Sequence, residues 1–292
     1  MKTSSKVLAS TPSKVGKAAM SAALYLPSFV DGFIHRKQFD GVETHCEFIG
    51  YPRSGHSLVG ALMNAHPEMV IANEVSALRY FYLGFSRRQV YSLIMRNARK
   101  SAMPGKELGG YVYNVPNQWQ GRVRNLKVIG DKDGYATCIR FALSPRYRAR
   151  LEREVGAKPK FVHVIRNPFD IISTRIRRST ELANDIQGGI DNFFWICDSI
   201  AEIKRLTPAS EIIDIRHEAF VQDPVGNLER ICAFFGVNAT DDYLRDCSGI
   251  VNESPNRSRL NATFQWTSEL IDTVHRGIER YPWLNGYDFK SP

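Results

Sequence analysis

The chain of 292 residues carries 39 Lys and Arg against 30 Asp and Glu, a formal net charge of +9, and 43% of its residues are hydrophobic. This apolar content is enough for a sizeable core, and the length fits one large α/β domain, although it also allows two. The basic balance suits an anionic ligand. Nucleic acid is disfavoured because the basic residues are scattered. The five cysteines are odd in number and lack a C-x-x-C spacing, which argues against a disulfide framework or a zinc site and favours a reducing cytoplasm.

The first 40 residues are expected to be distinct from the remainder of the chain. Four lysines occupy the beginning of this segment: Lys2, Lys6, Lys14 and Lys17. The mildly apolar stretch after them, residues 18–30, is too short for a membrane span. Residues 1–40 are therefore predicted to form a basic tail and a leading helix, and residues 41–292 a single domain. A peripheral membrane contact stays open, and four Asn-x-Ser/Thr sequons keep a luminal location open.

Strand-like and helix-like segments alternate from about residue 45 onward, which predicts a parallel sheet flanked by helices. Strands are expected at residues 45–51, 69–72, 126–130, 161–166 and 211–215. Helices are expected at residues 57–65, 168–178, 189–204, 224–235 and 267–280. The predicted fold class is therefore α/β, with three layers and a central parallel sheet.

The first strand–helix junction, Phe48 to Leu58, is expected to bind an anion. Gly50 and Gly55 bracket it with the G-x-x-x-x-G spacing of a nucleotide phosphate loop. Backbone N–H groups and the helix dipole favour negative charge there. His56 stands where an ATPase has Lys, and the positive charge lies inside the loop at Arg53. The loop therefore predicts a site for a phosphate-like group without the usual ATP and magnesium equipment.

A second junction, Phe161 to Thr174, has the same character. An alternating apolar strand ends at Arg166, and Pro168 starts the next helix. Arg166 therefore lies at the carboxyl end of a strand, where parallel sheets bind ligands, and its guanidinium fork can pair with a phosphate. Thr174 follows two helical turns later. Taken alone, this motif is also compatible with an ordinary helix start.

The two junctions together resemble the sulfotransferase family, most of all its tyrosylprotein, carbohydrate and bacterial branches. The first is similar to the loop that holds the donor 3′-phosphoadenosine 5′-phosphosulfate (PAPS), which implies donor contacts from Pro52, Arg53, Ser54, Gly55, His56 and Ser57. The second is similar to the motif for the donor 3′-phosphate, which implies contacts from Arg166 and Thr174, or Ser173. The resemblance implies a P-loop-like fold and metal-free sulfuryl transfer from PAPS to a hydroxyl or amine.

Sulfuryl transfer needs a base for the acceptor proton and cations for the charge on the leaving oxygen. The resemblance implies Glu74 as the base and Arg53 and Lys132 as the cations. His56 is a rival base because imidazole titrates near neutrality. The plainer alternatives are a solvated Glu at a helix N-terminus and a surface turn at Lys132.

Two further segments receive roles. The polar loop at residues 252–259 is similar to one that closes over the nucleotide, which implies Arg257, Ser258 and Arg259 as donor ligands. Residues 78–125, rich in Tyr, Arg, Gly and Pro, have no match and are expected to form an acceptor-binding insertion. The short run of Arg175, Arg177 and Arg178 is expected to be a solvated helix face.

The acceptor stays open between a small molecule, a carbohydrate and a peptide, and the oligomeric state is not predicted. Two other functions also remain. A P-loop kinase would use ATP, which the missing Lys at position 56 argues against. A non-catalytic nucleotide-binding relative is compatible with the unusual His56.

Overall fold

The computed structural model describes residues 14–156, 159–179, 182, 185–252, 254–261 and 265–291. The basic tail predicted before Lys14 lies outside the described residues. The leading helix is present as α1 (Lys14–Ile34), followed by the short α2 (Arg36–Asp40).

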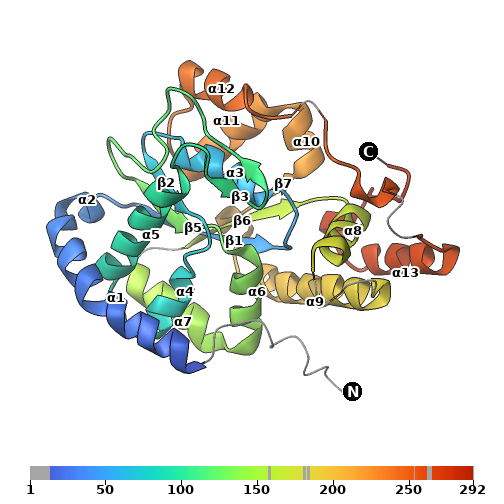
Figure 1. The fold of residues 1–292 in the computed structure, drawn as a ribbon, viewed down its shortest axis with the longest axis horizontal. Helices are drawn as coiled ribbons and strands as arrows, with labels where there is room; N and C mark the ends of the chain where they lie inside the picture. The colour runs from blue at the N-terminus through green and yellow to red at the C-terminus, as the bar shows by residue number, and fades with distance from the viewer. Residues whose placement is uncertain are drawn as a thin grey trace.

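A sheet of five parallel strands forms the centre of the molecule, in the order β2-β5-β1-β6-β7 (Figure 1). The strands are β1 (Thr44–Gly50), β2 (Met69–Ala72), β5 (Val128–Asp131), β6 (Lys160–Ile165) and β7 (Ile212–Arg216). All five were predicted, with bounds that agree to within two residues. A separate hairpin pairs β3 (Glu107–Leu108) with β4 (Tyr111–Val112).

Helices cover both faces of the sheet, so the predicted three-layer α/β fold is confirmed (Figure 1). One face is covered by α3 (His56–Asn64), α10 (His217–Gln222), α11 (Pro224–Phe235) and α12 (Asp241–Ser248). The other is covered by α4 (Ala77–Tyr82), α5 (Arg87–Ser101), α6 (Gly134–Leu143), α7 (Pro145–Val155), α8 (Pro168–Arg178), α9 (Ile186–Arg205) and α13 (Ser268–Ile278). Within the described ranges, short 3-10 turns lie at Ala209–Glu211, Ser258–Leu260 and Pro282–Leu284.

Side chains along each strand point alternately to the two faces of the sheet, so there is a core on each face. In β1, Cys46 and Phe48 pack with α3 and α11, whereas Ile49 packs on the opposite side with α8 and α9. Successive side chains of a strand point to opposite faces, and both faces are buried here, which explains the nearly continuous apolar runs in the sequence. Burial of a large apolar side chain stabilises by about 1.5–3 kcal/mol. The two cores therefore hold the strands, and the loops that leave them, in fixed positions.

Helix α1 lies outside the three layers, along α5 (Figure 1). The Ser92 hydroxyl of α5 donates to the carbonyl oxygen of Ser28, and Gln89 donates to that of Tyr25. Gly32 lets the two helices approach closely, since a methyl group there would lie 2.8 Å from the carbonyl oxygen of Arg88. No helix in the described ranges combines the length and the apolar character that crossing a membrane requires.

All five cysteines are buried free thiols: Cys46, Cys138, Cys197, Cys232 and Cys247. Burial raises the pKa of the Cys138 and Cys232 thiols to about 12. They are small core residues.

Candidate active site

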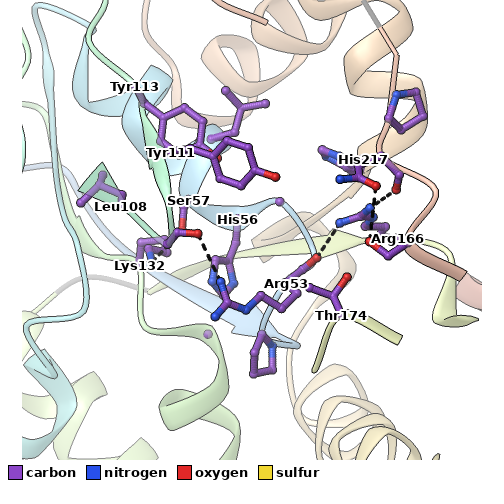
Figure 2. Close-up of a pocket in the computed structure, with 18 of the residues that line it drawn as sticks. Arg53, His56, Ser57, Leu108, Tyr111, Tyr113, Lys132, Arg166, Thr174 and His217 are labelled. Carbon is purple, nitrogen blue, oxygen red and sulfur yellow. Dashed lines mark hydrogen bonds between the residues drawn. The ribbon is translucent and has the colours of Figure 1, made fainter. Parts of the chain in front are cut away.

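A cavity of about 490 Å³ lies at the carboxyl edge of the sheet. Every strand contributes a polar residue to it at or just after its end. These are Arg53 after β1, Glu74 after β2, Lys132 after β5, Arg166 after β6 and His217 after β7. In Figure 2, Lys132 and Arg166 lie on opposite sides of the cavity, with Arg53 between them. The parallel topology therefore brings together charged residues that are far apart in the sequence.

The loop between β1 and α3 forms the floor of the cavity. Arg53 has a φ of 73° and Gly55, the residue before α3, a φ of 95°. Gly55 also lies against His217, because a methyl group at position 55 would be 2.4 Å from the imidazole Nδ1. Position 55 therefore requires glycine for two reasons, its left-handed backbone and the close imidazole.

Lys132 contacts residues from two different segments, Ser57 at the start of α3 and Glu74 after β2. Its ammonium group lies 2.7 Å from the Glu74 carboxylate and 3.1 Å from the Ser57 hydroxyl. The Lys132 side chain is 3% exposed, whereas that of Glu74 is 55% exposed. The structure thus brings the predicted base and one predicted cation into direct contact, with the carboxylate open to the cavity.

The loop that carries Glu74 is held by carboxylates at the end of β5. Asp131 accepts hydrogen bonds from the backbone N–H groups of Val75 and Ala77, at 3.0 and 2.9 Å. Asp133 accepts one from the Ser76 hydroxyl at 2.8 Å. Glu74 and Ser76 have φ values of 59° and 66°, which non-glycine residues adopt at a cost of about 1–3 kcal/mol. The carboxylates offset this cost and fix the direction of Glu74.

Two buried histidines face the cavity as neutral groups. Burial, then the charges of Lys132 and Arg53, lowers the pKa of His56 well below 6.5. Burial and Arg166 lower the pKa of His217 to about 3. Nδ1 of each ring is buried without a hydrogen-bond partner. At neutral pH each imidazole can therefore donate or accept a hydrogen bond, but neither carries charge.

Arg166 and Thr174 both line the cavity. One terminal nitrogen of Arg166 donates to the Arg53 carbonyl oxygen at 3.0 Å, and the other to that of Asn256. Nε of Arg166 and the hydroxyl groups of Thr174 and Ser54 are buried and have no partner. Buried polar atoms are normally paired, and leaving one unpaired costs about 1–3 kcal/mol. Arg166 and Thr174 line the cavity, whereas the predicted ligand Ser54 does not, so the unpaired atoms of Arg166 and Thr174 indicate a polar ligand there.

The other predicted donor ligands divide into two groups. Pro52, His56, Ser57 and Ser258 line the cavity. Ser173 does not, because its hydroxyl accepts a hydrogen bond from the Trp266 indole. Arg257 is exposed and does not line the cavity either.

Arg259 corrects the prediction. Its guanidinium is buried, lies 2.5 Å from the Asp170 carboxylate and donates to the carbonyl oxygens of Phe289 and Ser291. These partners use Nε, Nη1 and Nη2, so Arg259 stabilises the C-terminal segment instead of reaching the cavity.

The segment predicted to bind the acceptor reaches the cavity only near its middle. The β3–β4 hairpin places Leu108, Tyr111 and Tyr113 at the mouth (Figure 2). The Gly109 carbonyl oxygen accepts hydrogen bonds from Arg53 at 3.3 Å and from Arg178 at 2.9 Å. The hairpin therefore docks on arginines of two other elements.

Some residues at the site were not predicted. Arg177 and Arg178, interpreted as a solvated helix face, are exposed but line the mouth of the cavity. His217 was missed, although it follows a predicted strand as Arg166 does. Asp131 and Asp133 flank Lys132 and gave no separate signal. The described residues contain no group of three or more His, Cys, Asp or Glu placed to hold a metal ion.

Comparison with known proteins finds similarity to sulfotransferases. A model described as the sulfotransferase family matches residues 152–242. No curated protein matches the sequence. The match spans β6 and its Arg166 junction, as well as β7, α10 and α11. It confirms the resemblance to the sulfotransferase family over a span that includes the second junction and not the first.

Several solved structures share the fold at low sequence identity. The sulfotransferase domain from the curacin biosynthetic pathway aligns with a TM-score of 0.52 and 13% identity, over 82% of this chain and 98% of that one. A sulfotransferase of Mycobacterium avium, STF9, aligns with a TM-score of 0.50 and 10% identity, over 87% of this chain and 81% of that one. A mouse sulfotransferase, solved in complex with PAP, aligns with a TM-score of 0.47 and 10% identity, over 84% of each chain. At these identities the first two establish a shared fold.

Proposed function

We propose that this protein is a sulfotransferase that uses PAPS as its donor. The single observation that carries the proposal is the convergence of Arg53, Lys132 and Arg166 on a cavity that also contains unpaired buried polar atoms. Three cations at one sheet edge suit a ligand with several phosphate or sulfate groups. The family match over residues 152–242 supports the same class of reaction.

The residues that line the cavity fit both charged ends of the donor. The backbone N–H groups at the start of α3, together with Ser57, would hold the 5′-phosphosulfate. Arg166 and Thr174 would hold the 3′-phosphate, which would satisfy the Thr174 hydroxyl and the free Nε of Arg166. Binding these oxygens removes the penalty of the unpaired buried groups, so affinity arises from atoms already in place.

In the proposed transfer, an acceptor hydroxyl or amine attacks the sulfur in line with the leaving phosphate oxygen. A new bond to sulfur forms as the bond between sulfur and the phosphate oxygen breaks. Glu74 takes the acceptor proton. Arg53 and Lys132 neutralise the charge that develops on the leaving oxygen, and 3′,5′-adenosine bisphosphate departs. Glu74 suits the base role better than His56, because its carboxylate is half exposed whereas the His56 ring is buried.

We propose that the acceptor, a small molecule, a carbohydrate or a peptide, enters between the β3–β4 hairpin and Glu74. Tyr111 and Tyr113 are stacked there, with ring centroids 6.0 Å apart. Such aromatic faces can pack against a sugar or a phenol. The half-exposed Glu74 carboxylate lines the same cavity.

The test is calorimetric titration with 3′,5′-adenosine bisphosphate, in the presence of EDTA, against ATP with magnesium. We expect tight metal-independent binding of the bisphosphate and little binding of ATP. The variant Arg166→Ala should weaken bisphosphate binding about ten- to hundredfold, since a hydrogen bond to a charged group contributes roughly 1.5–3 kcal/mol.

Each other outcome is informative. A preference for ATP would favour a kinase, and binding of neither ligand would favour a relative that is not an enzyme. Unchanged affinity in Arg166→Ala would remove Arg166 from the donor site.

A further inference from the structure

The outward face of α1 is apolar throughout the part whose side chains are described. Every exposed residue between Ala22 and Ile34 is apolar. These residues are Ala22, Ala23, Tyr25, Leu26, Pro27, Phe29, Val30, Phe33 and Ile34. Leu26 is 71% exposed and Ile34 63%. Exposed apolar residues are ordinary when scattered, but a continuous apolar helix face marks a binding surface.

The inner face of the same helix is already occupied. Ser28 and Gly32 are buried against α5, and Ser28 is hydrogen-bonded to it. Asp31 lies 3.6 Å from Arg96 of α5, so the one acidic residue of α1 is paired at the edge of that contact. The helix is therefore held on the domain with its apolar face outward, and the face does not result from a detached segment.

Two basic residues, Arg36 and Lys37, follow the apolar face at the C-terminal end of α1. Residues 1–38 contain six Lys and Arg and a single Asp. Lys37 is exposed just after α1, and the Arg36 guanidinium lies 4.2 Å from the centre of the Phe33 ring. This is a cation–π contact, and the same guanidinium donates to the Phe33 carbonyl oxygen, so a positive charge is held at the edge of the apolar face.

We propose that α1 lies on an anionic lipid surface, with Leu26, Phe29 and Phe33 in the acyl boundary and the basic residues among the headgroups. An apolar helix face bordered by Lys and Arg is the pattern of helices that bind in the plane of a membrane interface. A second copy of the chain is a poorer occupant. A two-fold interface places the same patch against itself and would bring two basic segments together.

The experiment uses the full chain and sedimentation with vesicles. Phosphatidylcholine vesicles, with and without phosphatidylglycerol, provide the neutral and the anionic surface. We expect the protein to sediment with the anionic vesicles and to be released by high salt. The double variant Phe29→Ser/Phe33→Ser should lower the partition coefficient by about tenfold or more.

Two leucines provide a matched control. Leu26 and Leu143, at the end of α6, are 71% and 72% exposed. Leu26→Ser should weaken vesicle binding and Leu143→Ser should not, while thermal melting stays unchanged in both. This proposal does not depend on the sulfotransferase function, because neither readout uses the nucleotide.

Three results would overturn the proposal. One is a failure of the unmodified chain to sediment with anionic vesicles. Another is equal loss of binding in the two leucine variants. The third is a dimer in analytical ultracentrifugation that Phe29→Ser/Phe33→Ser dissociates, which would assign the apolar face to a second copy.

Discussion

At the level of single residues, Glu74 is the most exposed member of the charged centre. Its carboxylate is in contact with Lys132 and open to the cavity, so it can meet an acceptor that the buried groups cannot reach. Glu74→Gln keeps the shape and removes the basicity. We expect turnover to fall about 10²–10⁴-fold, the usual contribution of general base catalysis.

The measurement is the release of 3′,5′-adenosine bisphosphate with an acceptor found by screening phenols, sugars and alcohols. Binding of the bisphosphate serves as the control and should stay within about twofold, since removal of a proton acceptor leaves the donor contacts in place. Turnover that survives the substitution would rule out Glu74 as the base.

The buried His217 is expected to make the stability of the fold depend on pH. Its folded-state pKa is about 3, against an ordinary value of 6.5. Between these values the unfolded chain binds a proton that the folded chain does not, so the stability that His217 contributes falls as the pH falls. From pH 7 to pH 5 this loss amounts to about 2 kcal/mol.

His217→Asn should remove that part of the pH dependence. Urea denaturation at pH 7 and pH 5, with and without the substitution, gives the difference directly. We expect the variant to lose about 2 kcal/mol less between the two pH values. Identical losses would mean that the imidazole is protonated in the folded protein at pH 5.

At the level of elements, the turn into α3 depends on glycine. Gly55→Ala would combine a left-handed backbone with the contact to His217. Gly286 is the matched control, since its φ is 89° and nothing lies within 4 Å of the position of an added methyl group. Gly286→Ala should cost about 1–2 kcal/mol, the contribution of the backbone alone.

Gly55→Ala should cost more, and it should also weaken binding of the bisphosphate. Denaturation of both variants and titration of Gly55→Ala test this. A further substitution, His217→Ala, should recover part of the loss by removing the close contact. If Gly55→Ala costs no more than Gly286→Ala, the imidazole does not constrain the loop.

The elements that were predicted best are those with strong local signals. Helices α8 and α11 were predicted with their observed bounds. Each begins with a proline after a residue whose side chain accepts a backbone N–H, Asn167 in one and Asp223 in the other. Such caps are readable from neighbouring residues alone.

Helix α5 was missed because it packs on the sheet with one part of its surface and on another helix, α1, with a second part. Its buried face includes the polar residues Gln89 and Ser92, which hydrogen-bond to α1. Packing against α1 therefore blurs the apolar periodicity on which helix prediction depends. Helix α7 was also missed. It is largely exposed and charged, and only Leu151 and Val155 are buried, so it shows little apolar periodicity.

The site residues that could be predicted are those at the carboxyl ends of strands. Arg53, Lys132 and Arg166 all follow predicted strands, and the rule that located Arg166 applies equally to His217. Arg259 could not be placed from sequence. Whether an arginine in a polar loop binds a phosphate or a carboxylate depends on the position of Asp170, 89 residues away.

At the level of the whole molecule, the C-terminal segment encloses the second junction. The Asn167 side chain donates to the Asp288 carbonyl oxygen, and Arg259 bridges Asp170 and the carbonyl oxygen of Phe289. The Tyr287 hydroxyl donates to Glu218, which accepts the backbone N–H of Asn167. The position of Arg166 therefore depends on the last residues of the chain.

This arrangement gives a contrast between two neighbouring arginines. Arg259→Met leaves Asp170 as an unpaired buried charge and should lower the free energy of unfolding by about 3–5 kcal/mol. Arg257→Met changes an exposed side chain and should alter it by less than about 0.5 kcal/mol. Chemical denaturation of both variants is the measurement, and equal stabilities would contradict the structural role of Arg259.

The buried cysteines have a practical consequence. Because all five thiols lie inside the folded chain, an alkylating reagent finds thiolate only when the chain opens. The rate of alkylation therefore reports opening events without any added probe. A cysteine introduced at the exposed Leu143 would give a single attachment point for a fluorescent dye on an otherwise unreactive surface.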